Sequence, residues 1–209
     1  MEEETRSEIF DELIDHLAEE GFFIWDNFLS PSETESLRSL SLELLKEKAF
    51  TKAGIGRNQN FKMNDSIRGD HIFWLNKEIE QPVLDIFYNR ISEMTQSINR
   101  TLYLGINKHE FHFAIYPPGK GYNRHLDAFT NSDARKISII IYLNDSWQED
   151  WGGQLRLYLD QEIKDYYPIG GRMICMRSDL IEHEVMPVTK ERYSLTGWLR
   201  ADDPLKKLV

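Results

Sequence analysis

Cysteine, long apolar runs and basic residues are all scarce in this chain of 209 residues, and each scarcity excludes a class of protein. Cys175 is the only cysteine, so neither an intramolecular disulfide nor a structural zinc cluster of thiolates can form. The longest apolar run, residues 137–143, is far too short to span a bilayer as a helix. The N-terminus lacks the basic and apolar segments of a secretory signal, so we expect a cytoplasmic protein with no membrane partner.

Acidic residues outnumber basic ones, 35 to 25, which gives a net charge of −10. This excess of negative charge disfavours contact with phosphate backbones, so we expect no nucleic-acid partner. The hydrophobic fraction of 41% is sufficient for the packed core of one domain. We expect that domain to be a monomer.

Helical patterns occupy the first half of the chain. Residues 82–100 carry apolar side chains at spacings of three and four, the period of an amphipathic helix. Ser30 and Glu33 form a capping-box pattern around Pro31, which predicts that another helix begins there. Three helices are expected, at residues 5–20, 31–49 and 82–100, with short strands at 22–25 and 72–75. The polar residues 51–63 are predicted to form a mobile surface loop.

After residue 107 the period changes to two, which is typical of strands. Further strands are predicted at 137–143, 154–158, 163–167, 173–176 and 192–199. Helices followed by many short strands imply an α+β fold with a mainly β core, an antiparallel sandwich or barrel. We expect one globule made of a helical support region with the loop (1–106), a β core (107–201) and a C-terminal tail (202–209).

Three possible metal ligands stand out in the second half. His125 and Asp127 are two residues apart, so on a strand both side chains lie on one face. His183 directly precedes the last predicted strand, where an antiparallel fold can return it to the first pair. Two imidazoles and one carboxylate can hold one face of an iron(II) ion and leave three positions open. Because composition predicts about one such histidine–acid pair by chance, the assignment depends on the surrounding residues.

Arg192 lies on the last predicted strand and shares a face with Ser194, Thr196 and Trp198. If that face points inward, the buried guanidinium requires an anionic partner, since an unpaired buried charge is very costly. The chain offers no obvious carboxylate there, whereas a dicarboxylate such as 2-oxoglutarate suits the guanidinium fork. These residues together indicate a non-haem iron oxygenase that consumes 2-oxoglutarate.

Several segments resemble the prolyl 4-hydroxylase group of iron(II)- and 2-oxoglutarate-dependent dioxygenases. They are SIRGDHIFWL, FAIYPPGKGYNRHLD, ISIIIYLNDSW, WGGQLRLY, EHEVMPV and RYSLTGWLR, in that order. The resemblance is closest to bacterial relatives of the animal HIF prolyl hydroxylases. It implies a double-stranded β-helix (a jelly-roll, cupin-like fold) with the N-terminal helices packed on one sheet. It also implies that His125, Asp127 and His183 hold iron(II).

The same resemblance assigns roles to further residues. Arg192 would pair with the distal carboxylate of 2-oxoglutarate, helped by Tyr142 and Thr196, with Tyr116, Leu155 and Trp198 lining the pocket. On the substrate side it implies Arg68, Asp70, Trp74 and Arg135, with Arg135 as the ion-pair partner of Asp70 and the loop as a lid. His112 shares a face with Tyr116, and we expect its role to be structural.

The implied reaction couples oxidative decarboxylation of 2-oxoglutarate by dioxygen to hydroxylation of a C–H bond, with ascorbate as a possible reductant of the iron. By resemblance the substrate is a prolyl residue of another protein, hydroxylated at the 4-position, and a translation factor is a plausible target. Alternatives are an oxygenase of a small molecule or of another residue, a non-catalytic 2-oxoglutarate and iron sensor, and a zinc hydrolase. The zinc hydrolase leaves Arg192 and Tyr142 unexplained.

Overall fold

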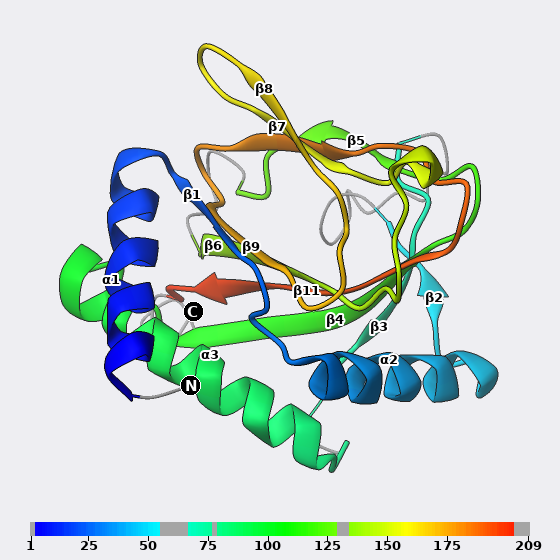
Figure 1. Ribbon diagram of the computed structural model, residues 1–209, viewed down its shortest axis with the longest axis horizontal. Coiled ribbons are helices and arrows are strands. Elements are labelled where there is room, and N and C mark those ends of the chain that lie inside the picture. Colours follow the sequence, from blue (N-terminus) through cyan, green and yellow to red (C-terminus); the bar gives the residue numbers. More distant parts are fainter. Residues whose placement is uncertain (1–2, 55–66, 77–78, 129–133, 203–209) are drawn as a thin grey trace, which may run out of the picture.

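The computed structural model describes residues 3–54, 67–76, 79–128 and 134–202. Two antiparallel sheets face each other, and three helices cover the outer face of the larger one (Figure 1). The larger sheet has the order β1 (Phe22–Trp25), β9 (Met173–Arg177), β6 (Arg135–Tyr142), β11 (Arg192–Arg200), β4 (Lys108–Tyr116), β3 (His71–Trp74) and β2 (Thr51–Lys52). The smaller has the order β5 (Tyr122–His125), β10 (Glu182–Val185), β7 (Leu155–Tyr158) and β8 (Ile163–Tyr166). This arrangement confirms the expected double-stranded β-helix.

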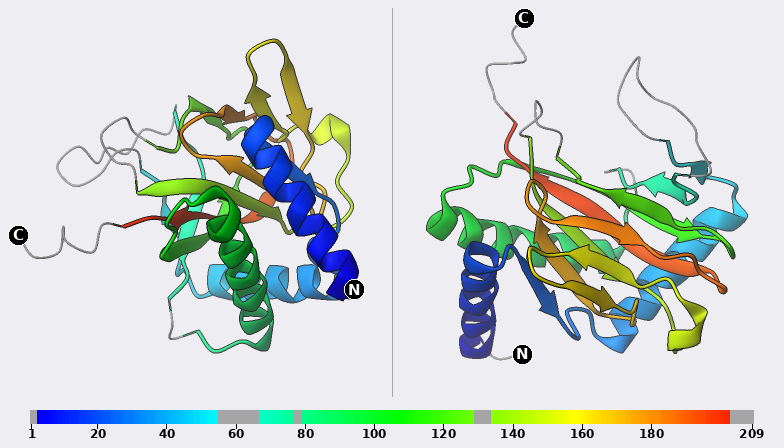
Figure 2. Two further views of the ribbon diagram at one scale, coloured as in Figure 1. Left: turned by 90° about the vertical axis from the view of Figure 1, so that its left-hand side faces the viewer. Right: turned by 90° about the horizontal axis from the view of Figure 1, so that it is seen from above.

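The three helices are α1 (Glu3–Glu19), α2 (Pro31–Lys46) and α3 (Pro82–Leu102). In Figure 1, α2 and α3 lie below the large sheet and α1 stands at its left beside β1, whereas the β7–β8 hairpin projects at the top. Figure 2 shows the same elements from two further sides. Four residues of the stripe predicted for α3, Phe87, Ile91, Met94 and Ile98, have no exposed surface, whereas the first, Val83, is partly buried. Burying each such side chain contributes roughly 1.5–3 kcal/mol, so packing on the sheet holds this helix in place.

Four of the six helix ends differ by one to three residues from the sequence prediction, since α1 begins two residues and ends one residue early, α2 ends three residues early, and α3 ends two residues late. The helix predicted at residue 5 already begins at Glu3. The predicted capping box of α2 is present, since Glu33 N–H donates to Ser30 Oγ and Ser30 N–H donates to the Glu33 carboxylate. That helix ends at Lys46, three residues early, where the chain turns through Lys48 at φ 58°.

Alternation along each strand separates two cores. One set of side chains packs against the helices, and the other packs between the two sheets, where Ala114, Ile140 and Leu155 meet. On β11 this period of two places Tyr193 and Leu195 on the helix side. Arg192 and its alternate neighbours therefore face the space between the sheets, and the guanidinium is buried there.

The N-terminal region also contributes strands to the large sheet. Strand β1 pairs with β9, and β3 pairs with β4, so residues before 107 form both margins of that sheet. The predicted loop 51–63 begins with β2, and most of it falls outside the described residues. None of the described helices is long and apolar enough to cross a membrane.

Candidate metal and 2-oxoglutarate site

Three potential metal ligands meet between the sheets. His125, at the end of β5, lies directly opposite His183 of β10 in the antiparallel register. One ligand atom from each of His125, Asp127 and His183 lies within 4.8 Å of the others. Nε2 of His125 is 3.5 Å from Oδ1 of Asp127, and Nε2 of His183 is 3.7 Å from Oδ2. The structure thus brings together the three residues that the sequence assigned to iron.

Backbone carbonyls fix the tautomer of both imidazoles. His125 Nδ1 is 2.8 Å from the carbonyl oxygen of Asn123, and His183 Nδ1 is 3.0 Å from that of Ile181. Because a carbonyl oxygen only accepts, Nδ1 carries the proton in each ring and Nε2 keeps its lone pair. Burial also lowers the pKa of His183, which favours the neutral form that binds metals. Both rings are therefore prepared to act as Nε2 ligands.

The third ligand is held as a carboxylate. Burial alone would raise the pKa of Asp127, but His183, His125 and a hydrogen bond from Ser138 outweigh it and hold that pKa well below its ordinary range. The Ser138 hydroxyl donates to Asp127 Oδ2 over 2.7 Å. Two imidazole nitrogens and one ionised carboxylate form the donor set of non-haem iron(II) sites. The residues present therefore fit the metal.

Arg192 lies deep in the same space, with only 1% of its surface exposed. Its Nε donates to the carbonyl oxygen of Gly153 over 2.9 Å. A side chain at Gly153 would meet Arg192 Cδ at 3.2 Å and would also have to adopt φ +70°, so this close approach requires glycine. Among the described residues, the buried Nη2 atom of Arg192 has no hydrogen-bond partner.

The rings of two tyrosines flank the guanidinium. Arg192 Cζ lies 5.1 Å from the ring centre of Tyr116 and 4.9 Å from that of Tyr142. Burial raises the pKa of Tyr142 although the charge of Arg192 and its contact with the hydroxyl act the other way, so the hydroxyl stays protonated. Among the described residues no hydrogen bond of standard geometry satisfies this buried hydroxyl. The Nη2 of this buried cation and the neighbouring Tyr142 hydroxyl are two donors that suit the distal carboxylate of 2-oxoglutarate. The chemistry of this end of the pocket therefore fits the cosubstrate.

Most of the predicted pocket residues line one cavity. It is bounded by the three possible metal ligands and Arg192 together with Tyr116, Leu155, Thr196, Trp198, Arg68, Asp70 and His112. Tyr142 is not part of that lining and reaches the site through Arg192. Trp74 and Arg135 also lie outside the lining, and the functional roles assigned from the sequence remain predictions.

One predicted pairing on the substrate side is wrong. Asp70 does not pair with Arg135 but accepts two hydrogen bonds from Arg68, at 2.7 and 2.9 Å. Arg135 instead donates to Glu110, and its Cζ lies 3.5 Å from the ring centre of Trp198. The difference arises because Arg68 and Asp70 lie two residues apart just before β3 and reach each other locally. Burial alone would lower the pKa of Arg68, but Asp70 outweighs it and raises that pKa.

The remaining substrate-side residue, Trp74, is 44% exposed. Its ring centre lies 4.6 Å from that of His112 and 6.2 Å from that of Trp198. His112 is thus covered by Trp74 on one strand and by Trp198 on another, at 5.5 Å. Both of its ring nitrogens are buried without a hydrogen-bond partner among the described residues. An exposed indole therefore covers a buried, neutral imidazole.

His112 makes stability depend on pH. Burial, with Arg68 next in importance, lowers the pKa of His112 from 6.5 to about 3, and the other charged groups near it are Asp70, Arg135 and Asp127. Between these values the unfolded chain binds a proton there and the folded chain does not, so stability is lost as pH falls below 6.5. At pH 5 we expect a loss of about 2 kcal/mol from this group. Urea unfolding at pH 7.5 and pH 5 measures it.

His112→Phe keeps an aromatic ring and should remove about 2 kcal/mol of that pH-dependent loss. The control is His109→Phe, which changes an exposed histidine on the same strand and should leave the loss that comes from His112 in place. Equal pH dependence in native protein and His112→Phe would show that His112 is not held neutral by burial.

Three residues of the site were not predicted as functional. Ser138 binds Asp127, Gly153 anchors Arg192, and the Tyr122 ring stacks on His125 at a centre distance of 3.7 Å. The shared face of Ser138 and Tyr142 was a visible signal, because residues four apart on a strand point the same way. For Gly153 the only signal was its place in a WGG turn.

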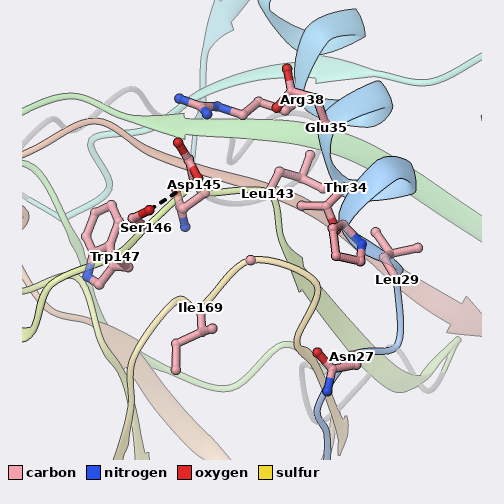
Figure 3. Close-up of a pocket in the computed structure, with 13 residues that line it drawn as sticks. Asn27, Leu29, Thr34, Glu35, Arg38, Leu143, Asp145, Ser146, Trp147 and Ile169 are labelled. Atoms are coloured by element: carbon pink, nitrogen blue, oxygen red, sulfur yellow. Dashed lines mark hydrogen bonds between the residues drawn. The ribbon is translucent and has the colours of Figure 1, made fainter.

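A second cavity lies beside the start of α2 and has a volume of about 250 Å³ (Figure 3). Its lining includes Thr34, Arg38, Asp145 and Trp147, and it contains none of the three possible metal ligands. The cavity at the metal ligands is smaller, about 40 Å³. Within the described part of the chain, His125, Asp127 and His183 are the one group of histidine, cysteine and acidic residues arranged to hold a metal. Donor chemistry, and not cavity size, therefore locates the candidate site.

Comparison with known proteins agrees with this geometry. A family model described as the 2OG-Fe(II) oxygenase superfamily matches residues 111–200. The chain is 31% identical over 207 residues to prolyl hydroxylase EGLN3 of Homo sapiens, covering 87% of this chain and 79% of that protein. Coverage of the matched relatives varies, since the chain spans only 28% of the length of a Caenorhabditis elegans relative.

Two solved structures share the fold. A Pseudomonas putida prolyl-4-hydroxylase has a TM-score of 0.84 and 34% identity, over 93% of this chain and 100% of that one. A Trichoplax adhaerens prolyl hydroxylase, solved with a hypoxia-inducible-factor oxygen degradation domain peptide, has a TM-score of 0.88 and 28% identity, over 95% and 91% of the two chains. The chain therefore belongs to the 2OG-Fe(II) oxygenase superfamily, as a relative of its prolyl hydroxylases, with iron(II), 2-oxoglutarate and dioxygen as cofactors.

Proposed function

We propose that this chain hydroxylates a prolyl residue of a protein substrate at its 4-position. The observation that carries the oxygenase part is a buried Arg192 with an unpartnered Nη2, in one cavity with His125, Asp127 and His183. The prolyl substrate is supported by the relatives, which include one structure with a bound peptide.

In this proposal iron and 2-oxoglutarate, when bound, supply the oxidising chemistry by activating dioxygen. The chain's own part is to bind and orient them. Nε2 of His125, Nε2 of His183 and the Asp127 carboxylate would hold the metal, while Arg192 and the Tyr142 hydroxyl would bind the distal carboxylate. Ala114, Ile140 and Leu155 form apolar walls that exclude water from the space between.

For the substrate side we propose that Trp74 offers an apolar surface to the prolyl ring. Its exposure of 44% leaves the indole accessible, and the neighbouring Trp198 extends that surface inward. The Arg68–Asp70 pair and Arg135 border the same region and would orient the peptide around the target residue. The Arg68–Asp70 pair is buried, with side-chain exposures of 13% and 1%, and its two charges already satisfy each other, so we expect the exposed aromatic surface to contribute more to binding than these charges.

We further propose a monomer in the cytoplasm that uses ascorbate to keep its iron reduced. The single cysteine, Cys175, is buried, and burial raises the pKa of its thiol, so the thiol is poorly reactive.

For the protein substrate, we propose to examine translation factors first.

A mass-shift screen tests the proposal. Cell extract is incubated with the enzyme, iron(II) and 2-oxoglutarate, and peptides are searched for a gain of about 16 mass units, one oxygen, on proline. We expect proline-specific shifts that disappear when Asp127→Ala replaces the native enzyme. If succinate forms but the mass gain of one oxygen is found only on small molecules or on residues other than proline, the prolyl assignment is contradicted. Absence of succinate would favour a non-catalytic sensor or a zinc hydrolase.

A further inference from the structure

Two buried serines form a hydrogen-bonded chain behind the proposed metal ligand. Ser138 Oγ lies 2.7 Å from Asp127 Oδ2 and 2.8 Å from Ser178 Oγ. Both serines are only 1% exposed. Ser138 is on β6, whereas Ser178 follows β9, so two neighbouring strands converge on one carboxylate oxygen.

The protons in this chain have a definite order. An ionised carboxylate has no proton to donate, so Ser138 must donate to Asp127. The single hydroxyl proton of Ser138 is then used, and Ser178 must donate to Ser138. Two hydroxyl dipoles thus point in series at Oδ2, and each strengthens the other.

The backbone of Ser178 ties down the segment that carries Asp127. Ala128 N–H donates to the carbonyl of Ser178 over 3.0 Å, and Ser178 N–H donates to the carbonyl of Lys136 over 3.1 Å. Asp127 is therefore held through its side chain and through the residue that follows it. Rotation of its carboxylate about the Cβ–Cγ bond would break the Ser138 bond.

We propose that Ser138 is a positioning residue that makes Asp127 bind the metal through Oδ1 alone. The inference rests on the iron-oxygenase part of the proposed function. Both oxygens face the imidazoles, since Oδ1 is 3.5 Å from His125 Nε2 and Oδ2 is 3.7 Å from His183 Nε2. The Ser138 hydroxyl distinguishes them, because it donates to Oδ2 and leaves Oδ1 as the oxygen free to bind the metal. With both oxygens on the metal, two imidazoles and a chelating 2-oxo acid would complete six positions. With one oxygen on the metal, a position remains for dioxygen.

The test counts the water left on the metal and needs no prolyl substrate. Manganese(II) replaces iron, 2-oxoglutarate is added to saturation, and the relaxation rate of solvent protons reports water bound to the manganese. In the native protein we expect a single bound water. In Ser138→Ala the freed Oδ2 should turn onto the metal and displace it, so the enhancement of relaxation should be lost. Ser138→Thr keeps the hydroxyl and should show the same relaxation enhancement as the native protein.

The matched control is Ser146→Ala. Ser146 is an exposed serine whose hydroxyl also lies beside an aspartate, 3.4 Å from Asp145 Oδ1, but in the second cavity (Figure 3). This variant should behave as the native protein does. If Ser138→Ala does not fold, Ser178→Ala removes the donor behind Ser138 and should lower the relaxation enhancement in part.

Three results would overturn the proposal. The first is unchanged relaxation in folded Ser138→Ala, or in Ser178→Ala where that variant replaces it. The second is loss of manganese binding by folded Ser138→Ala, which would mean that Ser138 holds Asp127 in place without setting its binding mode. The third is equal loss in Ser138→Thr and Ser138→Ala. Failure to find a hydroxylated prolyl substrate would leave all of these measurements unaffected, so the two proposals fail separately.

Discussion

Asp127→Ala is expected to abolish iron-dependent turnover and to leave the chain folded. Changing a residue that merely supports a metal ligand costs about 10–100-fold in metal affinity or activity, so losing the ligand itself should cost more than ~100-fold. The two histidines that remain meet across β5 and β10 but supply no negative charge to the metal. Succinate release from 2-oxoglutarate, measured at a fixed iron concentration, gives the loss directly.

Asp165→Ala is the matched control for this variant. Asp165 pairs with Arg156 on the exposed face of the small sheet, away from the metal ligands, so turnover should be unchanged. Asp127→Asn keeps the shape of the side chain without its charge and should fall close to Asp127→Ala. Full activity in Asp127→Ala, with a normal unfolding transition, would remove Asp127 from the metal site.

Arg192→Ala should raise the concentration of 2-oxoglutarate needed for half-maximal turnover by a factor that corresponds to roughly 2–5 kcal/mol, the cost of removing one partner of a buried charge pair. At 1.4 kcal/mol per tenfold this is on the order of 30- to 4,000-fold. The physical reason is that the Nη2 atom, unpartnered among the described residues, and its charge are both lost. Titration of 2-oxoglutarate binding to the manganese-loaded protein measures the same loss without turnover.

Arg192→Lys separates charge from geometry. Lysine keeps the charge but cannot both donate to Gly153 and present a fork to the carboxylate, so we expect an intermediate loss. Arg156→Ala, on the exposed face, should leave the requirement for 2-oxoglutarate as it is. An unchanged requirement in Arg192→Ala would show that this arginine only supports the fold.

Much of the fold was predictable because it follows from periodicity. The period of α3 predicted its buried stripe, and the period of two in β11 predicted which residues share a face with Arg192. That this face points inward is shown only by the folded sheet. The predicted ends of α1 and α2 differ from the observed ones, because a helix end depends on single residues, such as Lys48 at φ 58° after α2. Register between strands, which places His125 opposite His183, is a property of the folded chain and is not written in either segment alone.

The candidate site shows the same division. Ligand types and their spacing pointed to His125, Asp127 and His183, and the resemblance of the segments around them strengthened that prediction. The partner of Asp70 was predicted wrongly, because Arg68 and Arg135 both border the region and only the folded backbone shows which reaches it. The role of Ser138 was also missed, because the sequence places it on the same face as Tyr142 but does not show that its hydroxyl reaches Asp127.

A crystal structure of the protein with manganese(II) and 2-oxoglutarate, grown without oxygen, tests the central claim most directly. We expect the metal on Nε2 of His125, Nε2 of His183 and Oδ1 of Asp127, with the distal carboxylate of 2-oxoglutarate on Arg192 Nη2 and the Tyr142 hydroxyl. A metal bound elsewhere, or a 2-oxoglutarate molecule that leaves Arg192 Nη2 without a partner, would contradict this account.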